Sequence, residues 1–149
     1  MSNKVGKNHE HKRAGRVIAF QAIYSYEIQK KEVSELLSFV STVETNPDGL
    51  SYGKFLLEGT INNIHVIDAL IKEKLIKWDF NRISLIDKAV LRTAAFELLF
   101  SDVPDVIVIN EAVEIAKQFG NEESYKFING ILDAINKTKK QNLKNCQEH

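Results

Sequence analysis

Three basic side chains, Lys12, Arg13 and Arg16, lie where the basic N-terminal segment of the chain meets a predicted amphipathic helix. Lysine and arginine side chains neutralise phosphate groups, and a folded helix can hold them together as one phosphate-binding patch. The alternative is that they are simply solvated, as basic segments near chain ends usually are. The pattern therefore favours a nucleic-acid contact but leaves the solvated surface open.

The chain is electrically neutral as a whole, but its charges are unevenly distributed. Residues 1–16 hold five bases and one acid, a net charge of +4. Residues 137–147 hold four lysines and no acid. Residues 17–136 carry 11 bases and 18 acids, a net charge of −7. Two basic ends therefore flank an acidic body.

The residues that catalysis or metal binding would need are not spaced for either. The seven glycines never take the spacing of a phosphate-binding loop, which argues against nucleotide-dependent catalysis. His9 and His11 stand in the N-terminal segment and His65 is alone on a predicted helix, so no zinc site assembles. Cys146 would have to find a histidine from a flexible tail to act as a nucleophile. We expect no enzyme activity, no cofactor and no metal.

Composition indicates one cytoplasmic domain. The chain has 149 residues, of which 44% are hydrophobic and 27% charged, enough to bury a core without disulfides or metals. No apolar run approaches the ~20 residues that span a bilayer, and the N-terminal segment lacks the apolar core of a signal peptide. The single cysteine excludes an intrachain disulfide and fits a reducing compartment.

Helical spacing of apolar residues recurs along nearly the whole chain, and strand-like alternation is almost absent. The segment from Thr42 to Leu50 contains Pro47 and Gly49 and is predicted to be a loop, which could also separate two subdomains. We predict an all-α domain over 12–136, a compact bundle of about seven helices in two packed halves. Flanking it are a basic flexible tail (1–11) and a lysine-rich tail (137–149). The predicted helices are about 12–29, 33–40, 52–77 (one long helix or a broken one), 86–100 and 109–119, with a last helix that contains Ile128 to Ile135.

A central helix is predicted after Ser84, which can cap its start with Asp87 at the third helical position. Its apolar residues cover a wide arc, so it belongs near the centre of the bundle. Arg92 within it is expected to form a structural ion pair with Glu97 or Glu111. Gly59, in the preceding helix, is expected to permit a close helix crossing.

The most informative segment, Ile109 to Asp133, contains two amphipathic helices separated by Gly120. We expect Gly120 to end the first helix, and Glu111, Glu114 and Lys117 to point outward. The buried stripes are predicted to consist of Ile109, Ala112, Val113 and Ala116 in the first helix, and Ile128, Ile131, Leu132 and Ile135 in the second.

Phe127 lies beside the second stripe, about 100° round from Ile128. Its ring could belong to the core, or it could stack on an unpaired base with Lys126 contacting a phosphate. Tyr24 is expected to be partly core. Asn110 and Asn129 are assigned structural roles, and Gly130 is expected to let another helix come close.

Four blocks of this sequence, in the same order, resemble the NusB family of bacterial transcription antitermination factors. Two are the INEAVEIAKQFG and FINGILD segments just described. The others are IDKAVLRTAAFELLF from Ile86 to Phe100, which is similar to the family's central helix, and RAGRVIAFQAIYSYE from Arg13 to Glu27, which resembles its basic opening helix. The resemblance spans roughly Arg13 to Asp133.

The resemblance implies an RNA-binding adaptor rather than a catalyst. Members of the family pair with NusE, a ribosomal protein, and the two together hold the boxA element of single-stranded nascent RNA. The resulting complex helps RNA polymerase to pass terminators, chiefly in ribosomal RNA operons. A homodimer is an additional partner that the sequence neither requires nor excludes.

The resemblance also implies which residues make these contacts. Asp87, expected to be an exposed carboxylate near the start of the central helix, would face NusE. Ala14 and Gly15 interrupt an arginine run that is often denser in the family, so Lys4, Lys7 or the C-terminal lysines could compensate. The RNA-binding residues implied by motif position are Lys12, Arg13, Arg16, Tyr24, Glu123, Lys126 and Phe127.

Two other functions stay open at this point. A related helical domain is the N-terminal RNA-binding module of certain ribosomal RNA cytosine methyltransferases, which carry a large cofactor-binding domain after it. This chain stops at His149, which argues against the whole methyltransferase. The second alternative is a scaffold that dimerises through apolar helices and binds no RNA.

Overall fold

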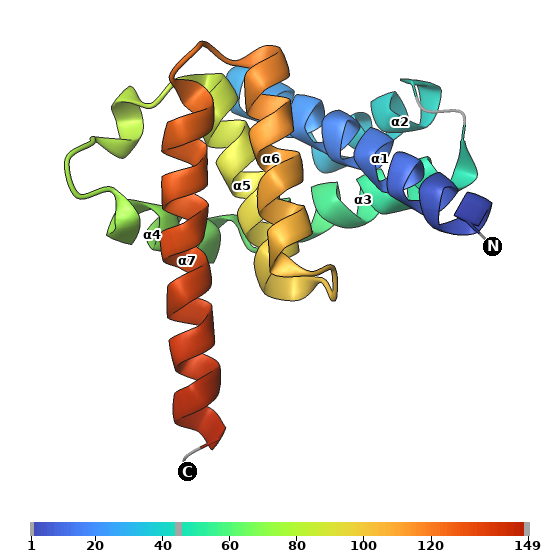
Figure 1. Cartoon of the computed structure of the whole chain (residues 1–149). Helices are drawn as coiled ribbons and strands as arrows, with labels where there is room; N and C mark the ends of the chain where they lie inside the picture. Colours follow the sequence, from blue (N-terminus) through green and yellow to red (C-terminus); the bar gives the residue numbers. More distant parts are fainter. Residues whose placement is uncertain (1, 44–45, 148–149) are drawn as a thin grey trace. The chain divides into compact units, whose positions relative to one another are not determined.

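The computed structural model describes the backbone of residues 2–43 and 46–147, and side chains over 10–42 and 46–142. The described residues form seven α-helices and one short 3₁₀ helix, with no strand (Figure 1). The predicted all-α class is therefore confirmed. The chain divides into two compact units, but after Asn63 rather than at the predicted loop near residue 45.

The first unit contains helices α1 (Ser2–Gln29), α2 (Val33–Val43) and α3 (Pro47–Asn62), with α1 packed mainly on α3. The backbone of residues 2–11, which we expected to be a flexible tail, continues α1 toward the N-terminus. The buried apolar side chains of this unit are Ile18, Ala19, Phe20, Ala22, Ile23, Leu36, Val40, Leu56 and Leu57.

Part of the predicted loop before residue 50 is the first turn of α3. Asn46 is the N-cap, and its side-chain oxygen accepts hydrogen bonds from the backbone N–H of Asp48 (2.9 Å) and Gly49 (3.3 Å). Pro47 occupies the first turn, where its fixed φ suits the helix and its missing N–H costs nothing. The Pro and Gly pair therefore marks a helix start here, whereas we took it for a loop.

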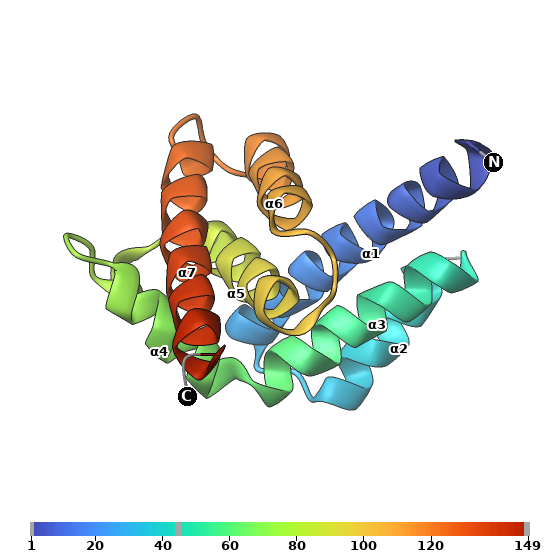
Figure 2. The ribbon, with the colours of Figure 1, turned by 60° about the horizontal axis from the view of Figure 1, so that its bottom comes forward.

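Helices α1 and α3 lie side by side (Figure 2) and approach most closely at glycines. A Cβ atom on Gly15 would lie 2.9 Å from both the Gly49 carbonyl oxygen and the Gly53 amide nitrogen. A Cβ atom on Gly53 would lie 3.3 Å from the Gly15 carbonyl oxygen. A close helix crossing of the kind that we expected at Gly59 is formed at Gly15 and Gly53, because only glycine leaves room for the opposing backbone.

The second unit contains α4 (Ile64–Lys74), the 3₁₀ helix η1 (Phe80–Arg82), α5 (Leu85–Phe100), α6 (Asp105–Phe119) and α7 (Ser124–Gln147). Helix α5 contacts α4, α6 and α7, and every residue from Asp87 to Leu98 is buried. The predicted central helix is confirmed. The segment over 52–77, expected to be one long or a broken helix, is broken at Asn63, whose backbone N–H and side-chain amide both donate to the Gly59 carbonyl.

The buried stripes of α6 and α7 follow the predicted spacing, except that Val113 is only half-buried. Glu111, which we expected to point outward, is only 5% exposed. Glu114 and Lys117 do lie on the surface, where they form an ion pair of 3.6 Å. Helix α6 also begins earlier than its apolar spacing indicated, at Asp105.

Gly120 follows the end of α6, but not with the left-handed conformation that usually selects glycine there. Its φ is −92° and its ψ is −170°, an extended conformation open to any residue. The steric constraint is different: a Cβ atom would lie 2.6 Å from the Ser124 hydroxyl oxygen and 2.8 Å from the Ala116 carbonyl oxygen. Glycine is needed because α7 begins so close to the end of α6.

Arg92 forms a structural ion pair with Asp68 of α4. Its Nε and Nη2 atoms donate to the two carboxylate oxygens, each at 2.8 Å, in bidentate geometry. Its guanidinium also lies 5.7 Å from the centre of the Phe80 ring, and the Lys88 ammonium lies 4.4 Å from the same centre. These contacts hold α4, η1 and α5 together.

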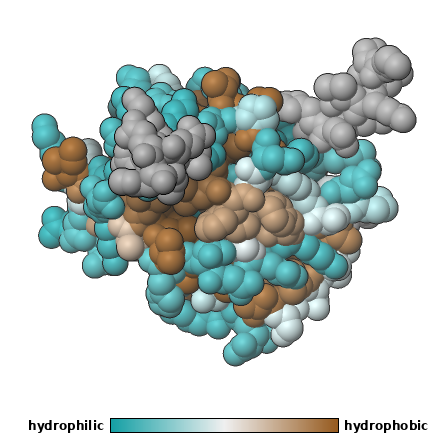
Figure 3. All heavy atoms as spheres, turned by 90° about the horizontal axis from the view of Figure 1, so that it is seen from below, coloured by the Kyte–Doolittle hydropathy of each residue, from teal (hydrophilic) through white to brown (hydrophobic). Residues whose placement is uncertain are grey.

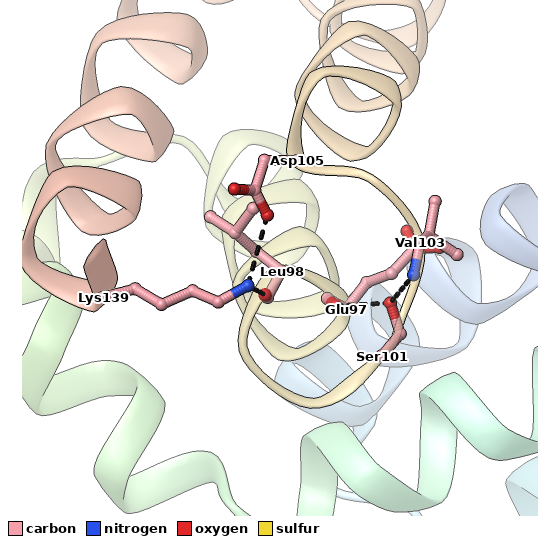
Figure 4. Close-up of polar contacts among 6 residues, drawn as sticks. All are labelled: Glu97, Leu98, Ser101, Val103, Asp105 and Lys139. Atoms are coloured by element: carbon pink, nitrogen blue, oxygen red, sulfur yellow. Dashed lines mark hydrogen bonds and ion pairs between the residues drawn. The ribbon is translucent and has the colours of Figure 1, made fainter. Parts of the chain in front are cut away.

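The lysine-rich segment after residue 136 is helical rather than a separate tail, because α7 continues to Gln147. Lys139 reaches the end of α5, where its ammonium donates to the Leu98 carbonyl (2.7 Å) and to Asp105 (3.2 Å). In the same connection, the Ser101 hydroxyl donates to the Glu97 carbonyl and accepts from the Val103 N–H (Figure 4). Lys139 is therefore a structural residue that ties α7 to the α5–α6 connection.

We predict opposite effects of adding a methyl group at two helical glycines. Gly15→Ala should destabilise the fold by about 1–3 kcal/mol, because the new Cβ atom meets backbone that cannot move independently. Gly130→Ala is the matched control: nothing among the described residues lies within 4 Å, so it should gain about 1 kcal/mol. Urea denaturation followed by circular dichroism measures both. Equal stabilities for the two variants would contradict the close crossing.

Candidate nucleic-acid interface

In the first unit, the predicted basic residues gather around one aromatic ring. The Lys12 ammonium lies 5.4 Å from the centre of the Tyr52 ring, and the Arg16 guanidinium lies 5.7 Å from it. Arg13 is exposed on the same helix. Arg16, in contrast, is only 4% exposed, so it supports the cluster from beneath rather than presenting its charge to solvent.

The α1–α3 glycine crossing explains this arrangement. Because the two backbones nearly touch at Gly15, Tyr52 of α3 is brought within reach of the α1 cations. The surface beside them is hollowed, about 360 Å³ in volume and lined by Lys12, Asp48, Ser51, Tyr52 and Phe55. The aromatic residues of this cluster were missed from the sequence, although their spacing of three on a helix places them on one face.

Tyr24, the fourth residue assigned to α1, is half-buried and does not line this hollow. Its partial burial agrees with the expected core role. It remains only a predicted RNA contact.

In the second unit, four predicted residues from two segments line one hollow of about 610 Å³. Asp87 comes from the first turn of α5, whereas Glu123, Lys126 and Phe127 come from the start of α7. The residues assigned to RNA and the residue assigned to the protein partner therefore share one surface. The remaining lining residues are Trp78, Arg82, Ile83, Ser84, Asn121 and Ser124.

A hydrogen-bonded turn fixes the start of α7 and with it the side chains of this hollow. The Asn121 side-chain oxygen accepts from the backbone N–H of Glu123 (3.0 Å) and Ser124 (3.1 Å). In return, the Ser124 hydroxyl accepts from the Asn121 N–H (3.1 Å). This reciprocal turn satisfies N–H groups that the helix itself leaves without partners. Lys126 and Phe127 follow within the first turn, so their direction is set by the cap.

Asp87 differs from our expectation of an exposed carboxylate. The predicted cap is confirmed, because the Ser84 hydroxyl accepts from the Asp87 N–H at 3.1 Å. Asp87, however, is only 8% exposed. Its side-chain Oδ1 atom has no hydrogen-bond partner among the described residues. A buried acceptor at the edge of a hollow favours a donor supplied by a binding partner.

Trp78 is the residue of this surface that the sequence reasoning missed. It lies in the connection between α4 and η1, is 65% exposed, and packs edge-to-face on Phe127 with 6.0 Å between ring centres. Phe127 itself is half-buried. The signal available in the sequence was a lone tryptophan in a non-helical connection close to Lys77 and Arg82.

Apolar side chains are also exposed at the end of α5 and the start of α6. Phe100 is 51% exposed, Val106 69% and Ile107 37%. Figure 3, which views the molecule from below, shows apolar atoms gathered among hydrophilic ones. Surface of this kind is used for protein association, so the dimer alternative keeps a physical basis.

Two other site types find no support in the described residues. No group of three or more histidine, cysteine, aspartate or glutamate side chains is arranged to hold a metal ion there. None of the described helices is both long and apolar enough to cross a membrane.

A family model and individual relatives both match this chain to the NusB family. The model of the NusB family matches residues 13–137. The transcription antitermination protein NusB of Treponema denticola is 40% identical over 128 residues, which are 83% of this chain and 94% of that protein. The protein of the same name from Staphylococcus haemolyticus is 39% identical over 126 residues, covering 83% and 98% of the two chains.

Solved structures also match the fold. The NusB of T. maritima superimposes with a TM-score of 0.77 at 38% identity, covering 85% of this chain and 90% of that one. A second structure, described as antitermination factors NusB and NusE in complex with double-stranded RNA, gives a TM-score of 0.78 at 27% identity. That match covers 87% of this chain and 98% of the other.

Proposed function

The chain belongs to the NusB family, and on that premise we propose that it is a transcription antitermination factor that binds boxA-like single-stranded RNA together with NusE. It acts as an adaptor in the cytoplasm, helping RNA polymerase to read through terminators, chiefly in ribosomal RNA operons. Its relatives carry the name transcription antitermination protein, and one solved relative is described in complex with NusE and double-stranded RNA.

The observation that carries the proposal is the hollow at the start of α7. Phe127 and Trp78 offer aromatic surface there, and Lys126 and Arg82 offer positive charge beside it. Single-stranded RNA needs both, because its unpaired bases stack on aromatic rings while its phosphates are neutralised by basic groups. Glu123 and Asp87 add acceptors for the N–H groups at base edges or on a partner.

The basic cluster on α1 supplies phosphate contacts. Lys12 and Arg13 carry this role, whereas the buried Arg16 holds Tyr52 in place beneath them. Phosphate contacts add affinity without reading sequence, and base contacts add selectivity. The cluster on α1 therefore contributes affinity, and the hollow at the start of α7 contributes selectivity.

We propose Asp87 as the NusE contact. Its Oδ1 atom is buried and lacks a hydrogen-bond partner among the described residues, so a cationic or N–H group from a partner would satisfy it. Charge pairs of this kind fix partner orientation as well as strength.

The salt dependence of RNA binding tests the proposal. The wild-type chain should bind a short boxA-like single-stranded RNA, with log affinity falling linearly against log salt concentration. Lys12→Ala/Arg13→Ala should flatten the slope by about 1.4, since each lost contact accounts for about 0.7. Fluorescence polarisation across a salt series, with and without NusE, measures it.

Lys137→Ala/Lys140→Ala is the matched control, because it removes two exposed lysines from α7 instead. Its slope should equal that of the wild type. Equal flattening by both double variants would show that α1 has no special role, and an unchanged slope for Lys12→Ala/Arg13→Ala would put the phosphate contacts elsewhere. No RNA binding by the wild type, even with NusE, would reject the proposed function.

Phe127→Ala should weaken RNA binding by about 1–3 kcal/mol, the usual value of one base stack. A core phenylalanine would instead cost about 3–5 kcal/mol of stability on truncation, whereas this one is only half-buried. Polarisation and urea denaturation on the same variant separate the two roles. Phe100→Ala, an exposed aromatic residue of the same unit outside the hollow, should leave RNA affinity unchanged. Large destabilisation with normal RNA affinity would make Phe127 a core residue.

Asp87→Asn should weaken NusE binding by about 1–3 kcal/mol, because it removes a charge but keeps the shape of a buried side chain. Glu123→Gln removes a neighbouring exposed carboxylate from the same hollow and serves as the control. Calorimetry with purified NusE and no RNA should show a loss only for the first variant. A folded Asp87→Asn chain with wild-type affinity would remove Asp87 from the interface.

A further inference from the structure

Trp78 is far more exposed than a tryptophan that only stabilises the fold would be. A tryptophan is normally largely buried, because its ring is the largest apolar surface that any side chain offers. Here 65% of the residue is exposed, and the connection that carries it is not helical. Its contact with Phe127 is edge-to-face, at 68° between ring planes, so the rings do not cover one another.

The Trp78–Phe127 pair separates two hollows. The first is the 610 Å³ hollow described above, and the second, of about 350 Å³, lies between the α4–η1 connection and α7. Trp78, Lys126 and Phe127 line both of them. These three side chains are therefore the boundary that the two hollows share, and we call this boundary the ridge.

The second hollow is basic as well as apolar. Its lining contains three lysines, Lys74, Lys77 and Lys126, and no acidic residue. Gly130 also lines this hollow, and a Cβ atom added there would meet nothing among the described residues within 4 Å. Aromatic and aliphatic surface surrounded by positive charge complements a nucleobase attached to a phosphate backbone.

We propose that Trp78 is a base-stacking residue and that the two hollows receive neighbouring bases of one RNA strand, on opposite sides of the Trp78–Phe127 ridge. The inference rests on the proposed RNA-binding function and extends it to a second base site. An apolar peptide would find the same rings, but it would bring no anionic group to Lys77 and Lys126; Lys74, the third lysine, already pairs with Glu73 at 3.4 Å. A nucleic-acid strand supplies those anions in its phosphates.

Intrinsic fluorescence provides a direct readout, because Trp78 is the only tryptophan of the chain. Titrating the intact chain with boxA-like single-stranded RNA should quench its emission, since a base stacked on the indole contacts the fluorophore itself. The quenching curve should give the same dissociation constant as polarisation. RNA that binds without changing the emission would overturn the proposal while leaving the proposed function intact.

Two substitutions at the same position separate stacking from plain apolar contact. Trp78→Leu keeps apolar bulk but loses the ring, and it should weaken RNA binding by about 5- to 150-fold. Trp78→Phe retains a ring and should recover most of the affinity. If both variants bind RNA like the wild type, or if leucine performs as well as phenylalanine, the stacking role is wrong.

Gly130→Leu tests the second hollow without depending on Trp78. The new side chain enters open space on α7 and replaces a residue that disfavours helix, so folding should be retained. Filling the hollow should weaken RNA binding by about 5-fold or more, whereas NusE affinity measured without RNA should not change. A folded Gly130→Leu chain with unchanged RNA affinity would show that no base enters the second hollow.

Discussion

The burial of α5 is the constraint on which the second unit depends. No residue from Asp87 to Leu98 is exposed, because α4, α6 and α7 pack around this helix. Near its start, the α4–η1 connection and the start of α7 come together. That meeting point is the hollow where Asp87, Trp78 and Phe127 come together. The same burial explains why polar groups in α5 need specific partners, as Arg92 has in Asp68.

In the first unit, the close contact between the glycine backbones of α1 and α3 determines where the site residues lie. Gly15 interrupts the basic run of α1, which looked like a weakness for RNA binding. In the fold it allows α3 to approach, and this places Tyr52 against Lys12 and Arg16. Both cations lie over the Tyr52 ring, and Arg16 is buried there.

The helices could be predicted because apolar spacing reports burial directly, as for Ile128 and Leu132, both fully buried. Polar residues were harder to place, because their position depends on packing between helices that are distant in sequence. Glu111 has the spacing of a surface residue and is buried, and Asp87 was expected to be exposed. Trp78 was missed for a related reason: its role depends on Phe127, which lies far along the chain and shares no periodic pattern with it.

The central claim is that RNA bases are held at the ridge formed by Trp78, Lys126 and Phe127. Ultraviolet cross-linking of the chain to boxA-like single-stranded RNA, followed by mass spectrometry of the peptides, tests it directly. The account predicts base cross-links in the two peptides that contain Trp78 and Phe127, and their loss when the RNA is first annealed into a duplex. Cross-links confined to other segments, or equally strong with the duplex, would contradict it.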